Sequence, residues 1–189
     1  MSATTHAKKH HAIHSTNHNF IHQAIHPAQN SEKLTGVPAS ITIAQAILES
    51  GWGKHHMGSA NNYFGVKAQT VKGKVTYGNV AIGYVDRTTK EHIKSLNKDI
   101  SIKAHFRSYK NMSDSFLDHG TFLKNNPRYS SALTAYAKTK NADDFAHGLQ
   151  KAGYATDPNY ANLLISIMKK YKLYQYNQKL TTVKPTKTP

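Results

Sequence analysis

Apolar residues recur at helical spacing over five stretches of the chain. In the first stretch, Ile41, Ala44 and Leu48 repeat at intervals of three and four residues, which is typical of one face of a helix. Pro38 suits the first turn of this helix, and Gly51 follows its last residues. The same kind of spacing predicts five helices, over about residues 37–50, 113–125, 129–137, 141–151 and 159–171.

In the middle of the chain the hydrophobic period changes from helical to alternating. Ile100, Ile102 and Phe106 alternate with polar residues, which is typical of a half-buried strand. Residues 96–99 supply turn-forming side chains before it, and residues 89–93 can form the partner strand. The sequence therefore predicts a mainly α fold that contains one β-hairpin.

The two ends of the chain differ in composition from the middle. Residues 1–30 contain seven of the thirteen histidines, two lysines and no acidic residue, and residues 177–189 contain three lysines and no acidic residue. Segments with few large apolar residues and an excess of one charge rarely bury a core. We therefore expect a flexible His-rich basic arm over 1–30, a folded domain over 31–176 and a flexible basic tail over 177–189.

The histidines of the first segment raise the question of a metal site. His10, His14, His18, His22 and His26 recur every four residues, so a helix would place them along one face. Histidine-rich tracts can bind metals. Because no carboxylate or packed scaffold is expected there to hold the imidazoles in place, we predict no metal site and no cofactor.

The net charge narrows the range of partners. The chain has 25 Lys and Arg against 10 Asp and Glu, a formal charge of +15, and removing both end segments still leaves 20 against 10. Such an excess predicts attraction to nucleic acid, a membrane surface or an anionic wall polymer. The basic residues are scattered and no zinc-finger or single-strand-binding motif is recognisable, so we expect no nucleic-acid partner.

Several classes of protein are excluded by absent features of the sequence. The chain has no cysteine, which excludes disulfide scaffolds, cysteine-ligated zinc and thiol nucleophiles. No apolar run approaches the roughly 20 residues that span a bilayer, so membrane insertion is not expected. The first residues lack an apolar segment typical of a secretory signal. This pattern predicts cytoplasmic synthesis, followed by release through a holin or a specialised apparatus.

The chain has only three glutamates, Glu32, Glu49 and Glu91. Glu32 lies in the leading polar segment. Glu49 lies in the last turn of the first predicted helix, beside its apolar arc, where the negative end of the helix dipole and partial burial both favour the protonated carboxyl. A carboxylic acid that stays protonated near neutral pH can act as the general acid of a glycoside hydrolase.

Residues 44–53, with the sequence AQAILESGWG, resemble the catalytic signature of the FlgJ-type glucosaminidases, glycoside hydrolase family 73. Further blocks follow in the order that the family has. They are NNYFGVK at 61–67, TKE at 89–91, FRSY at 106–109, NPRY at 126–129 and GYATDPNYA at 153–161. The resemblance covers about residues 34–173, and several weak blocks in one order make it specific.

The resemblance implies a lysozyme-like α+β helical domain with a β-hairpin beside the active-site cleft. It implies an endo-β-N-acetylglucosaminidase that cleaves peptidoglycan glycan strands between N-acetylglucosamine and N-acetylmuramic acid. Glu49 would be the general acid, and Glu91 on the hairpin would be the second carboxylate. Tyr154 and Tyr160 would line the sugar cleft, because tyrosine offers a sugar ring both an apolar face and a hydroxyl.

For several residues the sequence leaves two interpretations open. Tyr160 could equally pack between helices. Trp52 could stack on a sugar ring or close the core, and Asn62 could hold a backbone turn or bind the acetamido group of the substrate. The segment before the hairpin is long and rich in glycine, so Asp86 competes with Glu91 as the second acid. For Arg107, pairing with a nearby aspartate is the better interpretation.

The function also has alternatives. A muramidase or a lytic transglycosylase could share this fold, and a transglycosylase would need only one acid. A non-catalytic module that binds cell wall or nucleic acid is a third hypothesis. On the main hypothesis the protein is a lysin or autolysin that acts at the bacterial cell wall, is attracted to its anionic surface and functions as a monomer.

Overall fold

The structure is a computed structural model that describes the backbone of residues 3–93 and 97–180, and side chains over 16–89, 97–98 and 100–180. Five helices lie within two residues of their predicted bounds, which confirms a mainly α fold. The helices, including short 3₁₀ turns marked η, are α1 (Ala3–Thr35), α2 (Ala39–Ser50), η1 (Gly58–Ala60), α3 (Met112–Asn125), η3 (Pro127–Tyr129), α4 (Ser130–Thr139), α5 (Ala142–Lys151), α6 (Tyr160–Lys170) and η4 (Leu173–Tyr176).

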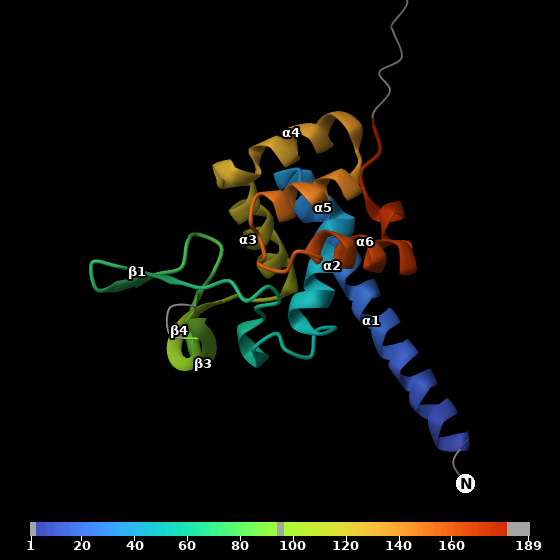
Figure 1. The fold of residues 1–189 in the computed structure, drawn as a ribbon, viewed down its shortest axis with the longest axis horizontal. Coiled ribbons are helices and arrows are strands. Elements are labelled where there is room, and N and C mark those ends of the chain that lie inside the picture. The colour runs from blue at the N-terminus through green and yellow to red at the C-terminus, as the bar shows by residue number, and fades with distance from the viewer. Residues whose placement is uncertain (1–2, 94–96, 181–189) are drawn as a thin grey trace, which may run out of the picture.

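Helix α2 lies at the centre of the helical body and contacts α1, α5, α6 and η4 (Figure 1). Its residues 39–47 are all buried, and Ile41, Ile43 and Ile47 point into a core shared with these helices. A helix that is apolar nearly all round is stable only when it is surrounded in this way. The position of α2 fixes where its last turn, which carries Glu49, is presented.

Helix α1 corrects the prediction for the N-terminal segment. Residues 3–30 of the expected flexible arm are instead part of a 33-residue helix that projects from the body (Figure 1). Phe20, Ile21, Ala24 and Ala28 of this helix are buried in the core. They form an apolar stripe at helical spacing, which the surrounding histidines and the small size of alanine concealed. The domain boundary at residue 30 is therefore wrong.

The packing of α1 on α3 depends on one glycine. A Cβ atom added to Gly120 of α3 would collide with the hydroxyl oxygens of Ser31 and Thr35 on α1. The two helices approach so closely that the Ser31 hydroxyl donates a hydrogen bond of 3.0 Å to the carbonyl oxygen of Phe116. This close contact anchors the C-terminal half of α1 to the body.

Glu32 of α1 joins four parts of the chain. Its buried carboxylate accepts hydrogen bonds from the backbone N–H of Ala39 at 3.0 Å, the hydroxyl of Tyr136 at 2.7 Å and the backbone N–H of Gln178 at 3.2 Å. Pro38, at the start of α2, has no capping side chain, so Glu32 supplies both the acceptor and the negative charge that a helix N-terminus favours.

The start of the C-terminal segment is attached to the same place. The side-chain oxygen of Asn177 accepts a hydrogen bond of 2.7 Å from the backbone N–H of Ser40. Together with the bond from Gln178 to Glu32, this holds the first residues of the predicted tail against the N-terminus of α2. Residues 181–189 of that tail lie outside the described part of the chain.

The predicted hairpin is present and is longer than expected. Strand β3 (Gly83–Ile93) pairs antiparallel with β4 (Lys98–Ser108), with Gly83 opposite Ser108 and Ile93 opposite Lys98. The hairpin extends to one side of the helical body (Figure 1). Its base is anchored by Phe106, which is buried, and by the backbone bond from Arg107 to the carbonyl of Val66.

The structure adds a second hairpin that the sequence analysis did not predict. Strand β1 (Gln69–Val71) pairs with β2 (Lys74–Thr76), and both are largely exposed. The two residues between them, Lys72 and Gly73, both have positive φ values, 49° and 76°, as the tight type I′ turn requires. This hairpin accounts for the long, glycine-rich approach to β3.

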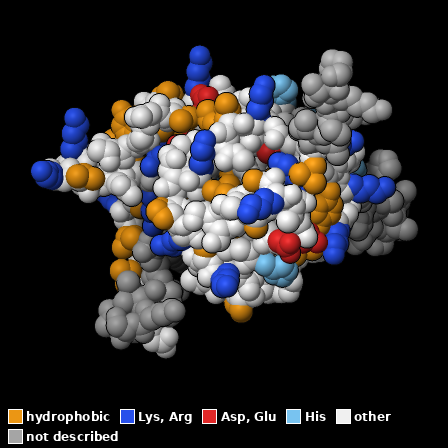
Figure 2. Space-filling model, turned by 90° about the horizontal axis from the view of Figure 1, so that it is seen from above, with side chains coloured by type: hydrophobic (Ala, Val, Ile, Leu, Met, Phe, Trp, Pro, Cys, Tyr) orange, Lys and Arg blue, Asp and Glu red, His pale blue; other side chains and the backbone are white. Residues whose placement is uncertain are grey.

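Basic side chains are spread over the surface in Figure 2, and the acidic ones are few.

Among the described residues, no helix is long and apolar enough to cross a membrane. Within the same residues, no three His, Asp or Glu side chains gather in a way that could hold a metal ion.

Candidate active site

Glu49 lies in the last turn of α2, and the chain reverses direction directly after it. Gly51, Trp52 and Gly53 all have positive φ values, 55°, 64° and 76°, which are costly for residues other than glycine. Gly53 also packs against the ring of Phe20, where a Cβ atom would lie 2.7 Å from two ring carbons. The position of Glu49 is therefore set by a tightly specified turn that rests on α1.

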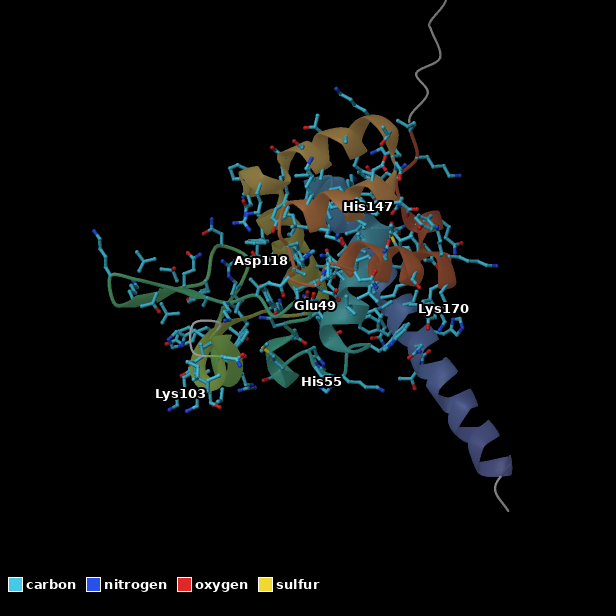
Figure 3. All side chains as sticks on the ribbon, viewed as in Figure 1. Glu49, His55, Lys103, Asp118, His147 and Lys170 are labelled. Carbon is cyan, nitrogen blue, oxygen red and sulfur yellow. The ribbon has the colours of Figure 1, made fainter. Side chains whose placement is uncertain are left out.

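The surroundings of Glu49 favour its protonated form. Glu49 stays accessible to solvent, yet neighbouring protein atoms remove enough water that desolvation raises the pKa of its carboxyl above 4.5. A hydrogen bond of 3.4 Å from the Tyr160 hydroxyl to Oε1 acts in the opposite direction and is the smaller effect. Figure 3 shows Glu49 near the centre of the molecule, on α2.

Tyr154 and Tyr160 meet beside this carboxyl. Their rings stack with centroids 5.5 Å apart and planes 24° apart. Tyr160 is only 3% exposed, which matches the interpretation that it packs between helices, and its hydroxyl contacts Glu49. Burial raises the pKa of both hydroxyls, which therefore stay protonated at neutral pH.

Tyr154 is half-buried and lines a cavity of about 310 Å³. The cavity combines aromatic faces with polar groups, as sugar sites do. Its lining consists of Phe64, Gly65, Val66, Lys67, Gln69, Arg107, His119, Phe122 and Tyr154. Of the two tyrosines proposed for the sugar cleft, Tyr154 is thus the one placed to touch a ligand.

Two buried residues of this site were not found from the sequence. Gln45, one turn before Glu49 on α2, donates a hydrogen bond of 2.9 Å to the Tyr160 hydroxyl. His119 of α3 stacks on Phe64, and its Nε2 lies 3.3 Å from the Tyr154 hydroxyl. Burial lowers the pKa of His119 to about 3, so it is neutral. In the sequence, Gln45 could have been noticed as a polar residue four positions before Glu49 among the apolar residues of this helix.

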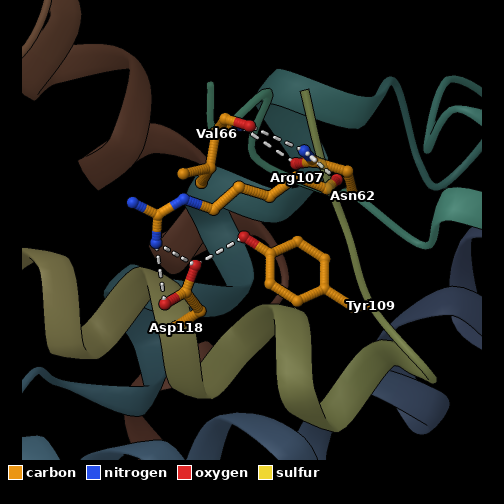
Figure 4. A network of polar contacts seen from close by, with 5 residues as sticks. All are labelled: Asn62, Val66, Arg107, Tyr109 and Asp118. Carbon is orange, nitrogen blue, oxygen red and sulfur yellow. Dashed lines mark hydrogen bonds and ion pairs between the residues drawn. The ribbon is translucent and has the colours of Figure 1, made fainter. Parts of the chain in front are cut away.

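A polar network holds the base of the β3–β4 hairpin against α3 (Figure 4). Arg107 donates to both carboxylate oxygens of Asp118, at 3.1 and 2.9 Å, and the Tyr109 hydroxyl donates to Oδ2 at 2.6 Å. The predicted pairing of Arg107 with an aspartate is confirmed. The pair is largely buried, so it fixes the hairpin base rather than offering a free charge.

Asn62 belongs to this network. Its amide nitrogen donates to the carbonyls of Val66 and Arg107, both at 2.9 Å, and its oxygen accepts from the N–H of Val66 at 3.0 Å. The residue is 1% exposed. These bonds match the interpretation that Asn62 holds a backbone turn, and sugar binding by Asn62 stays a prediction.

The ring of Trp52 contacts two other aromatic rings. It makes edge contacts with Phe20 at 6.4 Å and with Tyr171 at 4.9 Å between centroids. These contacts match the interpretation that Trp52 closes the core. Sugar binding by Trp52 stays a prediction.

The two candidates for the second carboxylate lie at different positions on β3. Glu91 is opposite Ile100 in the register, and its side chain lies outside the described residues. Glu91 lies four positions after Arg87 on β3, so the two register positions have the same parity. The Arg87 guanidinium donates a hydrogen bond of 3.5 Å to the carbonyl of Met57, in the turn region after α2. Asp86 has the opposite parity, is exposed and contacts His105 Nδ1 at 2.6 Å.

A second hollow lies between β3 and the segment that follows α2. Its volume is about 620 Å³. It is lined by Lys54, His55, Met57, Gly58, Arg87, Thr88, Thr89 and Phe106. The hairpin and residues 54–58 thus border an open groove.

Comparison with known proteins identifies the family. Residues 25–173 match the glucosaminidase family, described as mannosyl-glycoprotein endo-beta-N-acetylglucosaminidase. The chain is 37% identical over 154 residues to the peptidoglycan hydrolase FlgJ of Vibrio cholerae, covering 79% of this chain and 42% of that protein. It is 39% identical over 145 residues to the exo-glucosaminidase LytG of Bacillus subtilis, covering 74% and 46%.

A solved structure shows the same fold. The catalytic domain of the autolysin Auto from Listeria monocytogenes superimposes with a TM-score of 0.71 at 27% identity, covering 94% of this chain and 98% of that one. The chain spans less than half the length of the two curated relatives. With this match, the helical body and the hairpin are those of a lysozyme-like domain, and the chain belongs to the glucosaminidase family, glycoside hydrolase family 73.

Proposed function

We propose that this protein is an endo-β-N-acetylglucosaminidase that hydrolyses peptidoglycan between N-acetylglucosamine and N-acetylmuramic acid. The observation that carries the proposal is the carboxyl of Glu49. It is accessible, lies at the end of a buried helix, has a pKa raised by desolvation and contacts the Tyr160 hydroxyl. A positioned acid of this kind can protonate the glycosidic oxygen as the bond breaks.

Glu91 is the second carboxylate in this proposal. Its register position on β3 has the parity of Arg87 and Thr89, two of the three β3 residues that border the groove beside residues 54–58; the third, Thr88, has the opposite parity. A carboxylate on that side can activate water or stabilise the positive charge that develops on the sugar ring. The carboxylate of Asp86 already contacts the ring of His105, so Asp86 is the weaker candidate.

The substrate side of the proposal rests on Tyr154 and on the charge of the chain. The Tyr154 ring is partly exposed and lines a cavity, where a sugar ring can stack, and Tyr154 interacts electrostatically with Glu49. The formal charge of +15 favours approach to a wall rich in stem-peptide carboxylates and anionic polymers. We infer action at the bacterial cell wall, as a monomer and without a cofactor.

The decisive experiment is mass spectrometry of purified peptidoglycan digested by the protein and then reduced with borohydride. Fragments that end in N-acetylglucosaminitol are expected from the wild type, and internal chain fragments distinguish endo cleavage from the release of single terminal sugars. Fragments that end in N-acetylmuramitol would indicate a muramidase. A 1,6-anhydro-muramyl end would indicate a transglycosylase.

The control is Glu49→Gln, which keeps the shape of the side chain and removes the acid. Because general acid catalysis contributes about 10²- to 10⁴-fold, turnover should fall by that factor while the circular dichroism spectrum is unchanged. Wild-type turnover in this variant would contradict the role of Glu49. No fragments from folded wild type on several wall types would favour a non-catalytic binding module.

A further inference from the structure

Gln45 and Glu49 lie one turn apart on α2 and reach the same hydroxyl. Gln45 Nε2 donates to Tyr160 Oη at 2.9 Å, and Tyr160 Oη donates to Glu49 Oε1 at 3.4 Å. A phenol oxygen has one proton to donate and can accept two hydrogen bonds. Because the amide occupies one accepting position, the Tyr160 proton is left to point at the carboxyl.

We propose that Gln45 is a positioning residue for the reaction: it directs the Tyr160 proton to Oε1 of Glu49 and so leaves Oε2 as the atom that carries the proton to be transferred. An oxygen that accepts a hydrogen bond from Tyr160 is a poor place for the acid proton. The proton therefore resides on Oε2. The inference deepens the proposed function and rests on it for its kinetic consequence.

The burial of Gln45 supports a role beyond packing. Its side chain is fully buried, and its Oε1 has no hydrogen-bond partner among the described residues. A buried carbonyl without a partner destabilises the folded state. A methionine of similar volume would fill the space without that cost. The position keeps an amide although an apolar residue would be cheaper for stability.

The other groups around Glu49 do not offer a substitute for Tyr160. Tyr154, from the α5–α6 connection, and Tyr129, from η3, interact electrostatically with Tyr160. From the hairpin, Arg87 contacts the carbonyl of Met57, and the side chain of Glu91 lies outside the described residues. Tyr160 is thus the described side chain that donates to Glu49.

The test measures the pKa of Glu49 directly in the free protein. The chain has only three glutamates, so selective ¹³C labelling of glutamate carboxyls gives three signals, and a Glu49→Gln sample assigns one of them. The samples are wild type, Gln45→Met, Tyr160→Phe and the double variant. Thr42→Val is the matched control, because Thr42 is also fully buried on α2 and bonds only its own helix at Pro38.

Loss of a hydrogen bond to the charged form raises the pKa of a carboxyl. We expect Gln45→Met and Tyr160→Phe each to raise the pKa of Glu49 by about half a unit to one unit, since the 3.4 Å bond is long. The double variant should match Tyr160→Phe, because Gln45 acts through Tyr160. Thr42→Val should leave the pKa unchanged, and Gln45→Met should unfold at or above the wild-type temperature.

Three results would overturn the inference. The first is an effect of Gln45→Met on the pKa of Glu49 that persists in the Tyr160→Phe background. The second is a Glu49 pKa in Gln45→Met that equals the wild-type value, and the third is a melting temperature of Gln45→Met far below that of wild type. The kinetic measurement is the dependence of kcat/KM on pH for the same variants. The pH at which kcat/KM falls on the alkaline side should move upward in parallel with the Glu49 pKa. Absence of turnover in wild type would count against the proposed function, while the titration still decides the role of Gln45.

Discussion

Glu32 on α1 and Tyr136 on α4, 104 positions apart in the chain, share a buried hydrogen bond of 2.7 Å. The same carboxylate also caps α2 at Ala39. The Glu32 side chain therefore connects α1, helix α4 and the N-terminus of α2, the helix that carries Glu49. The acid at one end of α2 depends on the anchoring of the other end.

Replacing Glu32 should destabilise the fold strongly. Glu32→Ala leaves the Tyr136 hydroxyl and the Ala39 N–H without their partner in a buried place, so we expect a loss of about 2–4 kcal/mol in the free energy of unfolding. Tyr136→Phe removes only one bond and should cost about 1 kcal/mol. Urea unfolding at pH 7 measures both. Equal effects of the two variants would show that the cap on α2 contributes nothing.

Removing the acid should stabilise the protein at neutral pH. Because desolvation raises the pKa of Glu49, the folded state holds this proton more tightly than the unfolded chain. Stability linked to Glu49 is therefore present below about pH 4.5 and decreases as pH rises through the folded pKa. Glu49→Gln should melt above wild type at pH 7 and at the same temperature as wild type at pH 4.

Thermal unfolding at the two pH values checks this, and a variant that is less stable than wild type at pH 7 would contradict the pKa shift. The gain should be small, since Glu49 remains accessible to water. Stability and catalysis are thus opposed at this position.

His119 should make the fold sensitive to acid. Burial lowers its pKa to about 3, so the unfolded chain takes up a proton below its usual pKa of about 6.5 and the folded state does not. The stability that a neutral His119 contributes is present above about pH 6.5 and falls by up to about 1.4 kcal/mol per pH unit as the pH drops towards 3.

His119→Leu should flatten this decline, measured as the free energy of unfolding in urea between pH 7 and pH 4. The exposed His147 on α5 provides the control, and His147→Gln should keep the wild-type slope. A slope in His119→Leu that equals the wild-type slope would show that the buried imidazole gains a proton without cost.

The two candidates for the second carboxylate can be separated by a pair of isosteric variants. Glu91→Gln should lower kcat on peptidoglycan by about 10²-fold or more, as expected for loss of a catalytic carboxylate. Asp86→Asn should change kcat little, because the Asp86 carboxylate is exposed and contacts the ring of His105, which lies opposite it on β4. The opposite pattern would assign the role to Asp86.

The elements that could be predicted are those whose signal is local. Helices α2 to α6 follow from apolar spacing, because a helix face repeats every three or four residues. The β1–β2 hairpin has a local signal as well, since the two turn residues Lys72 and Gly73 stand between short segments that contain the β-branched residues Thr and Val. That signal was hidden because a lysine, rather than asparagine or aspartate, stands first in the turn.

The site was predictable only in its motif residues. Glu49 was found from its place on a helix and from its neighbours, but the role of Gln45 depends on Tyr160, which lies 115 positions away. His119 likewise meets Tyr154 across 35 positions. The role of Asn62 stayed open because one of its three hydrogen bonds reaches the carbonyl of Arg107 on β4, 45 positions away. Contacts between distant segments leave no periodic trace in a sequence.

The position of Phe20 has a practical consequence for the design of shorter fragments. The match to the family begins at residue 25, and a fragment cut there would lack the ring on which Gly53 packs and against which Trp52 and Tyr63 lie. The turn after Glu49 would lose its support although every motif residue were retained. The smallest piece of this chain that keeps the acid in place therefore starts before Phe20, upstream of the boundary that family similarity alone suggests.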